Sequence, residues 1–70
     1  MKRIEVESSN IKSIGYSEEE RILQVEFNNL SVYNYKDVPK DVYDEMIVSE
    51  SKGKYLYQYI KGVYEYEPND

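Results

Sequence analysis

The sequence predicts a small α+β fold, in which an antiparallel sheet of about three strands is followed by two short helices packed on one face. Three observations carry this prediction. Apolar residues alternate with polar ones in the first half of the chain, which is typical of half-buried strands. Two later segments repeat apolar residues at helical spacing. Strands followed by helices in this order favour two packed layers.

Two strand signals come first along the chain. Apolar and acidic residues alternate over residues 4–7, which predicts a short lead-in strand. A second strand is predicted over residues 11–16, and regular alternation would place Ile11 and Ile14 on opposite sides of it. The polar run 17–21 contains three consecutive glutamates and is typical of a solvated loop.

A hairpin over residues 23–35 is the strongest strand signal. Its first strand alternates apolar and polar residues up to Phe27. The Asn28-Asn29 pair that follows is typical of a turn, because asparagine tolerates left-handed backbone geometry better than most residues. The second strand then carries Tyr33 and Tyr35 two positions apart, so both rings lie on one face.

Two registers of this hairpin are possible. A two-residue turn pairs Phe27 with Leu30 and sends both tyrosines of the second strand away from the Phe27 face. A three-residue loop pairs Phe27 with Ser31 and places those tyrosines beside Phe27, because a slip of one residue exchanges the faces. We favour the second register because it gathers more apolar area on one face. It leaves Leu30 where such loops usually have glycine.

Two short helices are predicted after the hairpin. Pro39 suits the first turn of a helix. Asp37 or Val38 would be its cap, and Asp37 is the better chemical choice. We expect Gly53 to end the first helix as a left-handed cap and Gly62 to close the second. The apolar stripes of the two helices are Val42, Tyr43, Met46 and Ile47, and then Tyr55, Leu56, Tyr59 and Ile60.

The end of the chain and its length complete the outline. Residues 63–67 alternate and are expected to be extended, whereas residues 67–70 are typical of a frayed tail. With 70 residues and no internal repeat, we expect one domain over residues 1–70. The chain has no long apolar run, so we expect a cytoplasmic protein with no membrane partner.

Composition argues against several classes of function. The chain has no Cys and no His, which rules out a zinc site of the usual kind and the commonest nucleophiles and bases. We therefore expect a non-catalytic protein with no metal and no cofactor. The net charge of −5 argues against general binding to polyanions. Residues 51–62 nevertheless carry three lysines and no acid, so a local basic patch survives in an acidic protein.

This basic segment holds the candidate binding residues. Ser51-Lys52-Gly53-Lys54 lies between the two predicted helices, where free backbone N–H groups, lysines and a glycine could receive a phosphate. The alternative is a plain helix connector with a capping glycine. Tyr57 lies off the apolar stripe beside this cluster, and with Lys61 it completes the candidate nucleic-acid or phosphate site: Ser51, Lys52, Gly53, Lys54, Tyr57 and Lys61.

The aromatic pair of the hairpin allows two interpretations. Single-strand-binding proteins stack bases on rings displayed by a sheet, and Tyr33 and Tyr35 have the spacing for it. The same spacing describes two rings packed beneath a helix. In the favoured register the helices cover both rings, which favours a place in the core. A binding surface is the alternative for this aromatic motif.

Taken together, these motifs resemble the KTSC domain, a family found at the C-terminus of some lysyl-tRNA synthetases and as small stand-alone bacterial and phage proteins. The resemblance spans Val6 to Tyr66, and its hallmark is the central Tyr-x-Tyr, here Tyr33 and Tyr35. This chain departs from the family pattern at Leu30, where glycine is usual. The motifs are Ser8-Ser9-Asn10-Ile11, Ile14-Gly15-Tyr16, Leu23-x-Val25-x-Phe27, Val32-Tyr33-x-Tyr35, Val38-Pro39, Ser51-Lys52-Gly53-Lys54-Tyr55 and Ile60.

The resemblance implies a small binding module with RNA or another single-stranded nucleic acid as its partner, and it brings no catalytic residues. The alternative is a protein-interaction module or a homodimer, which the small core and the surplus of nine tyrosines would also suit.

Overall fold

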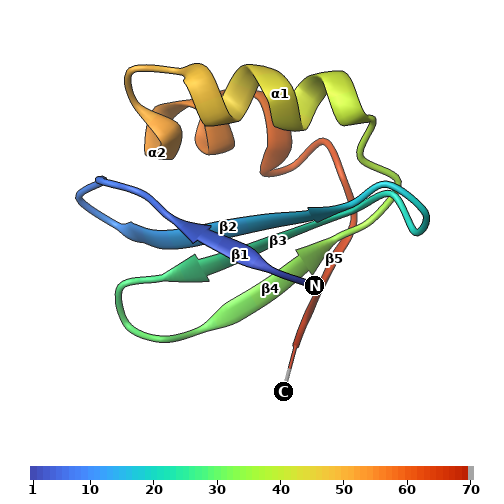
Figure 1. Cartoon of the computed structure of the whole chain (residues 1–70), viewed down its shortest axis with the longest axis horizontal. Helices are drawn as coiled ribbons and strands as arrows, with labels where there is room; N and C mark the ends of the chain where they lie inside the picture. The colour runs from blue at the N-terminus through green and yellow to red at the C-terminus, as the bar shows by residue number, and fades with distance from the viewer. Residues whose placement is uncertain (70) are drawn as a thin grey trace.

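The chain folds into two layers, with a five-stranded antiparallel sheet on one side and the helices on the other (Figure 1). The computed structural model describes residues 1–69. Neighbouring strands follow the order β1-β2-β3-β4-β5. The elements are β1 (Arg3–Glu5), β2 (Ile11–Ser17), β3 (Ile22–Phe27), β4 (Val32–Tyr35), α1 (Lys40–Val48), α2 (Lys52–Tyr55), η1 (Leu56–Ile60) and β5 (Tyr66–Pro68).

The predicted α+β arrangement of a sheet with helices on one face is confirmed, but the prediction of about three strands is too low. The lead-in strand β1 pairs fully with β2. The chain also returns after the helices, and β5 pairs with β4 at the opposite edge. The expected frayed tail is therefore wrong as far as Asn69, whose N–H donates to the Val32 carbonyl at 2.9 Å. Asp70 lies outside the described residues.

The favoured hairpin register is confirmed. Leu23 pairs with Tyr35 and Val25 with Tyr33, so both tyrosines share the face of the apolar β3 residues. The loop closes through the Phe27 N–H, which donates to the Ser31 carbonyl at 2.9 Å. Leu30 adopts a left-handed backbone with φ of 72°, a conformation that costs a side-chain-bearing residue about 1–2 kcal/mol.

The predicted sides of β2 are wrong at one position. Ile11 and Ile14 are both fully buried on the helix-covered face. The register shifts between Ile11 and Ser13, where a bulge in β2 adds one residue relative to β3. Because an extra residue breaks the strict alternation of a strand, both isoleucines reach the core. The buried core consists of Ile11, Ile14, Leu23, Val25, Tyr35, Val38, Met46, Leu56 and Ile60.

The helix boundaries correct two further predictions. Pro39 itself is the residue before α1, while Asp37 has a left-handed φ of 57° and does not cap the helix. Gly53 does not end the first helix, because α1 stops at Val48 and Gly53 lies inside α2. Gly62 does follow the second helix with φ of 83°, as predicted.

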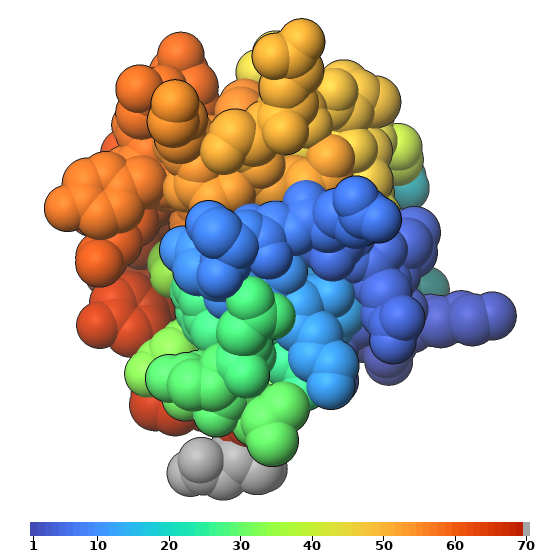
Figure 2. Space-filling model, turned by 90° about the vertical axis from the view of Figure 1, so that its left-hand side faces the viewer, coloured from blue at the N-terminus to red at the C-terminus, as the bar shows by residue number. Residues whose placement is uncertain are grey.

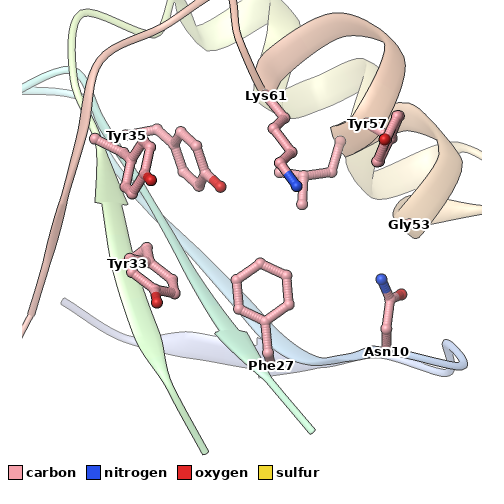
Figure 3. A pocket seen from close by; sticks show the side chains of 9 residues that line it. Asn10, Phe27, Tyr33, Tyr35, Gly53, Tyr57 and Lys61 are labelled. Carbon is pink, nitrogen blue, oxygen red and sulfur yellow. The ribbon is translucent and has the colours of Figure 1, made fainter. Parts of the chain in front are cut away.

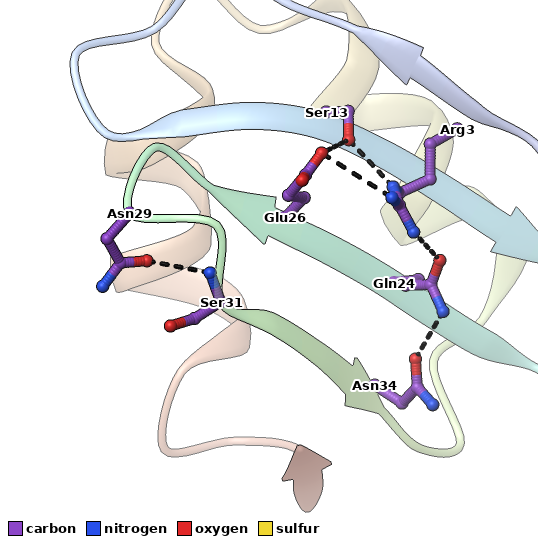
Figure 4. Close-up of polar contacts among 7 residues, drawn as sticks. All are labelled: Arg3, Ser13, Gln24, Glu26, Asn29, Ser31 and Asn34. Carbon is purple, nitrogen blue, oxygen red and sulfur yellow. Dashed lines mark hydrogen bonds and ion pairs between the residues drawn. The ribbon is translucent and has the colours of Figure 1, made fainter. Parts of the chain in front are cut away.

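The face of the sheet away from the helices is polar and internally bonded (Figure 4). Arg3 donates to Ser13 Oγ at 2.9 Å and to Gln24 Oε1 at 2.5 Å. Gln24 in turn donates to Asn34 at 3.0 Å, and Ser13 donates to Glu26 at 2.8 Å. These side chains bond one another across four strands, so this face is largely satisfied without a ligand. No helix within residues 1–69 is long and apolar enough to cross a membrane.

Candidate binding site

A cavity of about 280 Å³ opens between the helix-covered face of the sheet and the α2–η1 segment (Figure 3). We call it the tyrosine cavity. The Lys61 side chain points into its middle, with the tyrosines of β4 on one side and Asn10 on the other. Its lining residues are Asn10, Phe27, Tyr33, Tyr35, Gly53, Leu56, Tyr57, Lys61 and Tyr66.

The helical wall of the cavity is a π-helical turn. In η1 the Lys61 N–H donates to the Leu56 carbonyl at 2.7 Å, a bond that spans five residues. Such widened turns recur at functional sites. Leu56 points into the core, while Tyr57 and Lys61 lie one turn apart on the exposed side. The Lys61 ammonium stands 5.1 Å from the centre of the Tyr57 ring, within cation–π range.

The sheet wall of the cavity is a run of aromatic rings in mutual contact. Tyr33 meets Phe27 edge to face with ring centres 5.8 Å apart, and it meets Tyr66 of β5 in the same way at 5.4 Å. Tyr66 also lies 5.6 Å from the Tyr35 ring. The last strand therefore supplies a ring that widens the aromatic wall made by β3 and β4.

Tyr35 lies deepest of these rings, at 4% exposure. Its hydroxyl has no hydrogen-bond partner among residues 1–69, yet no side-chain polar atom in that range is both buried and unpaired. The hydroxyl therefore reaches the cavity surface. Burial raises the pKa of Tyr35, and the neighbouring Tyr66 and Tyr33 raise it further, so the group is a neutral phenol at physiological pH.

Asn10 and Gly53 form the far wall together. A Cβ on Gly53 would lie 2.6 Å from the Asn10 Oδ1 atom. Glycine is thus required here so that the β1–β2 loop can approach α2, and not for a left-handed backbone. Ser8 holds the loop, because its hydroxyl donates to Asn10 Oδ1 at 3.1 Å and accepts from the Ile11 N–H at 3.3 Å.

Five of the eight residues predicted from sequence meet in this cavity. They are Tyr33, Tyr35, Gly53, Tyr57 and Lys61.

The other three predicted residues do not line the cavity. Ser51 caps α2 by accepting from the Lys54 N–H at 3.3 Å, and Lys52 donates to the Ser49 carbonyl at 2.8 Å. Lys54 is exposed. The proposed phosphate contact of these residues stays a prediction. Sequence reasoning did not assign the remaining lining residues to a site: Asn10, Phe27, Leu56 and Tyr66.

Charge is distributed unevenly between the ends of the molecule. Among residues 1–69, the lining of the cavity contains one lysine and no acid. The turn between β2 and β3, which carries Glu18 to Glu20, lies at the opposite end of the sheet from α2 (Figure 1). Figure 2 faces the cavity end, where the segments around residues 10, 30 and 55 meet. Within residues 1–69 no cluster of acidic residues could hold a metal ion.

Comparison with known proteins places this geometry in a family. The KTSC domain model matches residues 7–64. An uncharacterised protein of Stutzerimonas stutzeri is 38% identical over 61 residues, which cover 87% of this chain and 86% of that protein. A lysine–tRNA ligase of Trichormus variabilis is 41% identical over 61 residues, which cover 87% of this chain but 11% of the ligase.

A solved structure agrees with these sequence matches. The crystal structure of a KTSC domain protein from Yersinia pestis superposes with a TM-score of 0.96 at 32% identity, covering 99% of this chain and 97% of that one. The resemblance noted from the sequence motifs is thereby confirmed, and the chain belongs to the KTSC domain family.

Proposed function

We propose that this domain is a non-catalytic module that binds single-stranded RNA, with one unpaired base in the tyrosine cavity. One observation carries the proposal. Within residues 1–69, the cavity combines stackable rings with a lysine that forms no ion pair, and no acid lines it. Aromatic faces beside a free cation are the usual means of holding an unstacked base and its phosphate.

Tyr57 and Lys61 are the central contacts in this proposal. Tyr57 is 71% exposed, so its ring can accept a base without displacing core atoms. A base stacked on such a ring contributes about 1–3 kcal/mol. Lys61 already lies against that ring, where its ammonium would neutralise the adjacent phosphate. Lys54, exposed beside Gly53, would contact the next phosphate along the strand.

The relatives support RNA over other polyanions. Lysine–tRNA ligases of Trichormus variabilis and of a Nostoc strain carry a segment that is 41% and 39% identical to this chain over 61 residues. The name of those enzymes, lysine–tRNA ligase, refers to a tRNA. The net charge of −5 for the whole chain makes a confined contact more suitable than a broad electrostatic one.

A shift titration of the ¹⁵N-labelled protein tests the proposal. We expect an oligouridylate of about eight nucleotides at low ionic strength to move the amide signals of Gly53, Tyr57 and Lys61. Affinity should fall as salt rises, with a shallow slope that corresponds to about two phosphates. Lys61→Gln should weaken binding, whereas Lys2→Gln, an exposed lysine that does not line the cavity, should leave it nearly unchanged.

Two outcomes would overturn this proposal. One is the absence of any shift with RNA at low salt. The other is equal weakening by both lysine substitutions, which would indicate diffuse charge attraction. The alternative is a protein-binding or homodimerising role, which the exposed Tyr59, Val63 and Tyr66 side chains would suit, at 56%, 63% and 56% exposure. Sedimentation that shows a dimer whose interface covers these side chains would support that alternative.

A further inference from the structure

We infer that the tyrosine cavity selects a base whose exposed edge presents a carbonyl oxygen, with uracil preferred over cytosine. This inference rests on the proposed RNA-binding function and gives it a base preference. The observation behind it is that the polar groups directed into the cavity are mainly donors, and that the orientation of the Asn10 amide is fixed by its neighbours.

The Asn10 amide has one oxygen and one nitrogen whose positions determine what it can recognise. Ser8 donates its hydroxyl proton to Oδ1 at 3.1 Å, while the same hydroxyl oxygen accepts the backbone N–H groups of Asn10 and Ile11 at 3.4 and 3.3 Å. Because that hydroxyl already accepts two N–H groups, it has no lone pair left for the amide N–H groups of Asn10, and its proton is donated to the amide oxygen.

The amide nitrogen is consequently turned away from Ser8. The Oδ1 atom is also the atom nearest to Gly53, at 2.6 Å from the Cβ position there, with Nδ2 at 3.6 Å. In Figure 3 the nitrogen lies on the side towards Lys61. It has no partner among residues 1–69, so two N–H donors are available to a ligand in the cavity.

The other polar groups reinforce this pattern. The Lys61 ammonium can only donate, and it points into the cavity (Figure 3). The Tyr35 hydroxyl is neutral and open to the cavity, so it can donate too. Against these donors, the part of the chain that the structure describes adds no carboxylate to the lining. A base edge rich in carbonyl oxygens satisfies such a site, whereas an exocyclic amino group placed there would face donors and lose a hydrogen bond.

The size of the cavity limits how much of the strand enters. A volume of about 280 Å³ is at the lower end of the range for small-molecule sites, so it suits one base and not two. Uracil and cytosine have the same ring and nearly the same stacking surface. They differ at C4, where uracil carries a carbonyl oxygen and cytosine an amino group, and at N3, where uracil carries an N–H and cytosine an acceptor nitrogen; the inferred preference concerns the contact at C4. The pair therefore isolates the hydrogen-bond contribution.

The test compares oligouridylate and oligocytidylate of equal length, about eight nucleotides each, by fluorescence competition on the wild-type protein and two variants. We expect wild type to bind the uridine oligomer about tenfold more tightly. Asn10→Asp keeps the side-chain shape but replaces both donors by an acceptor, so the ratio should fall below one. Asn10→Ala should bring the ratio close to one.

The ratio of the two affinities tests the base preference separately from the proposed RNA binding on which it rests. The added negative charge of Asn10→Asp weakens both oligomers alike and leaves the ratio to report the edge contact. Equal binding of the two oligomers by wild type, with shifts at Tyr57 and Lys61, would overturn the base preference and leave RNA binding intact. An unchanged ratio in Asn10→Asp would also overturn it. Binding of neither oligomer would overturn both, and a melting curve confirms that each variant is folded.

Discussion

The two ends of the helix-covered sheet face use tyrosine in opposite ways. At one end Tyr16 stacks on Tyr43 with ring centres 5.2 Å apart, and its hydroxyl donates to the Val38 carbonyl. At the other end Tyr33, Tyr57 and Tyr66 surround a cavity, and their hydroxyls have no protein partner within residues 1–69. We call the first the closed end, because its tyrosine hydroxyl is bonded within the protein, and the second the open end, because it contains the cavity.

The difference lies in what each phenol can reach. Tyrosine buries a large ring but keeps a polar tip that needs a partner. Val38 is held beside the β2–β3 turn, because its N–H donates to the Arg21 carbonyl at 2.9 Å, and its own carbonyl accepts the Tyr16 hydroxyl. Within residues 1–69 no main-chain carbonyl accepts a tyrosine hydroxyl at the cavity end, where η1 presents the side chains of Tyr57 and Lys61 instead. We infer that the closed end serves stability and the open end serves binding.

The largest effect that would test this comparison is at the closed end. Tyr16→Ala should lower the free energy of unfolding by about 3 kcal/mol, because it removes a packed ring and leaves the Val38 carbonyl without its donor. Tyr57→Ala at the open end should change stability by less than about 0.5 kcal/mol. Urea unfolding of both variants measures the two values. Similar losses at both positions would show that the two ends do not differ in role.

The next effect is on affinity at the open end. Tyr57→Leu should weaken binding of an oligouridylate by about 1–3 kcal/mol, because the stacking surface is lost. Tyr59→Leu is the matched control, since Tyr59 is also exposed and rests on Tyr55 at 4.8 Å without lining the cavity. Calorimetric titration measures both affinities. An equal loss in the control would assign binding to the outer helical surface and not to the cavity.

The comparison also shows what sequence reasoning could reach. The hairpin register was predictable because only one register gathers Tyr33 and Tyr35 with the apolar β3 residues, and burial outweighs the strain at Leu30. Local signals of that kind act between neighbouring residues. The same holds for Gly62, whose left-handed φ of 83° is a property of the helix end itself.

The features that sequence reasoning missed depend on contacts between distant segments. The pairing of β5 with β4 joins residues on either side of both helices, and nothing in the alternation of 63–67 names its partner. The bulge at Ile11 breaks the strand period without a glycine to mark it. Gly53 was misread because a capping glycine and a glycine required for space look identical in sequence, and its neighbour Asn10 lies far away along the chain.

A smaller effect tests that packing of Gly53 against Asn10. Gly53→Ala should lower stability by about 1 kcal/mol, because its Cβ would displace the Asn10 side chain. In an Asn10→Ala background the same substitution should cost much less, since the clashing atom is gone. A double-mutant cycle by thermal unfolding measures this coupling. Additive losses would mean that α2 and the β1–β2 loop do not meet closely in solution.

The last effect, of similar size at neutral pH and smaller at alkaline pH, concerns a tyrosine that belongs to neither end. Tyr55 donates its hydroxyl to Glu45 at 2.7 Å and so ties α2 to α1. Burial, followed by this bond to Glu45, raises the pKa of Tyr55 to about 12. Because the pKa is higher in the folded state, the contribution of Tyr55 to stability is complete below pH of about 10 and is lost as pH rises to about 12.

Tyr55→Phe tests that dependence. It should cost about 1 kcal/mol at neutral pH, and the difference from wild type should shrink through the alkaline range. Urea unfolding at a series of pH values measures the difference, with Tyr59→Phe as the control for a hydroxyl that has no protein partner within residues 1–69. A constant difference between wild type and Tyr55→Phe up to the highest pH would mean that the phenol keeps its proton there or that Glu45 does not hold it. In the second case the two helices would be joined by packing alone.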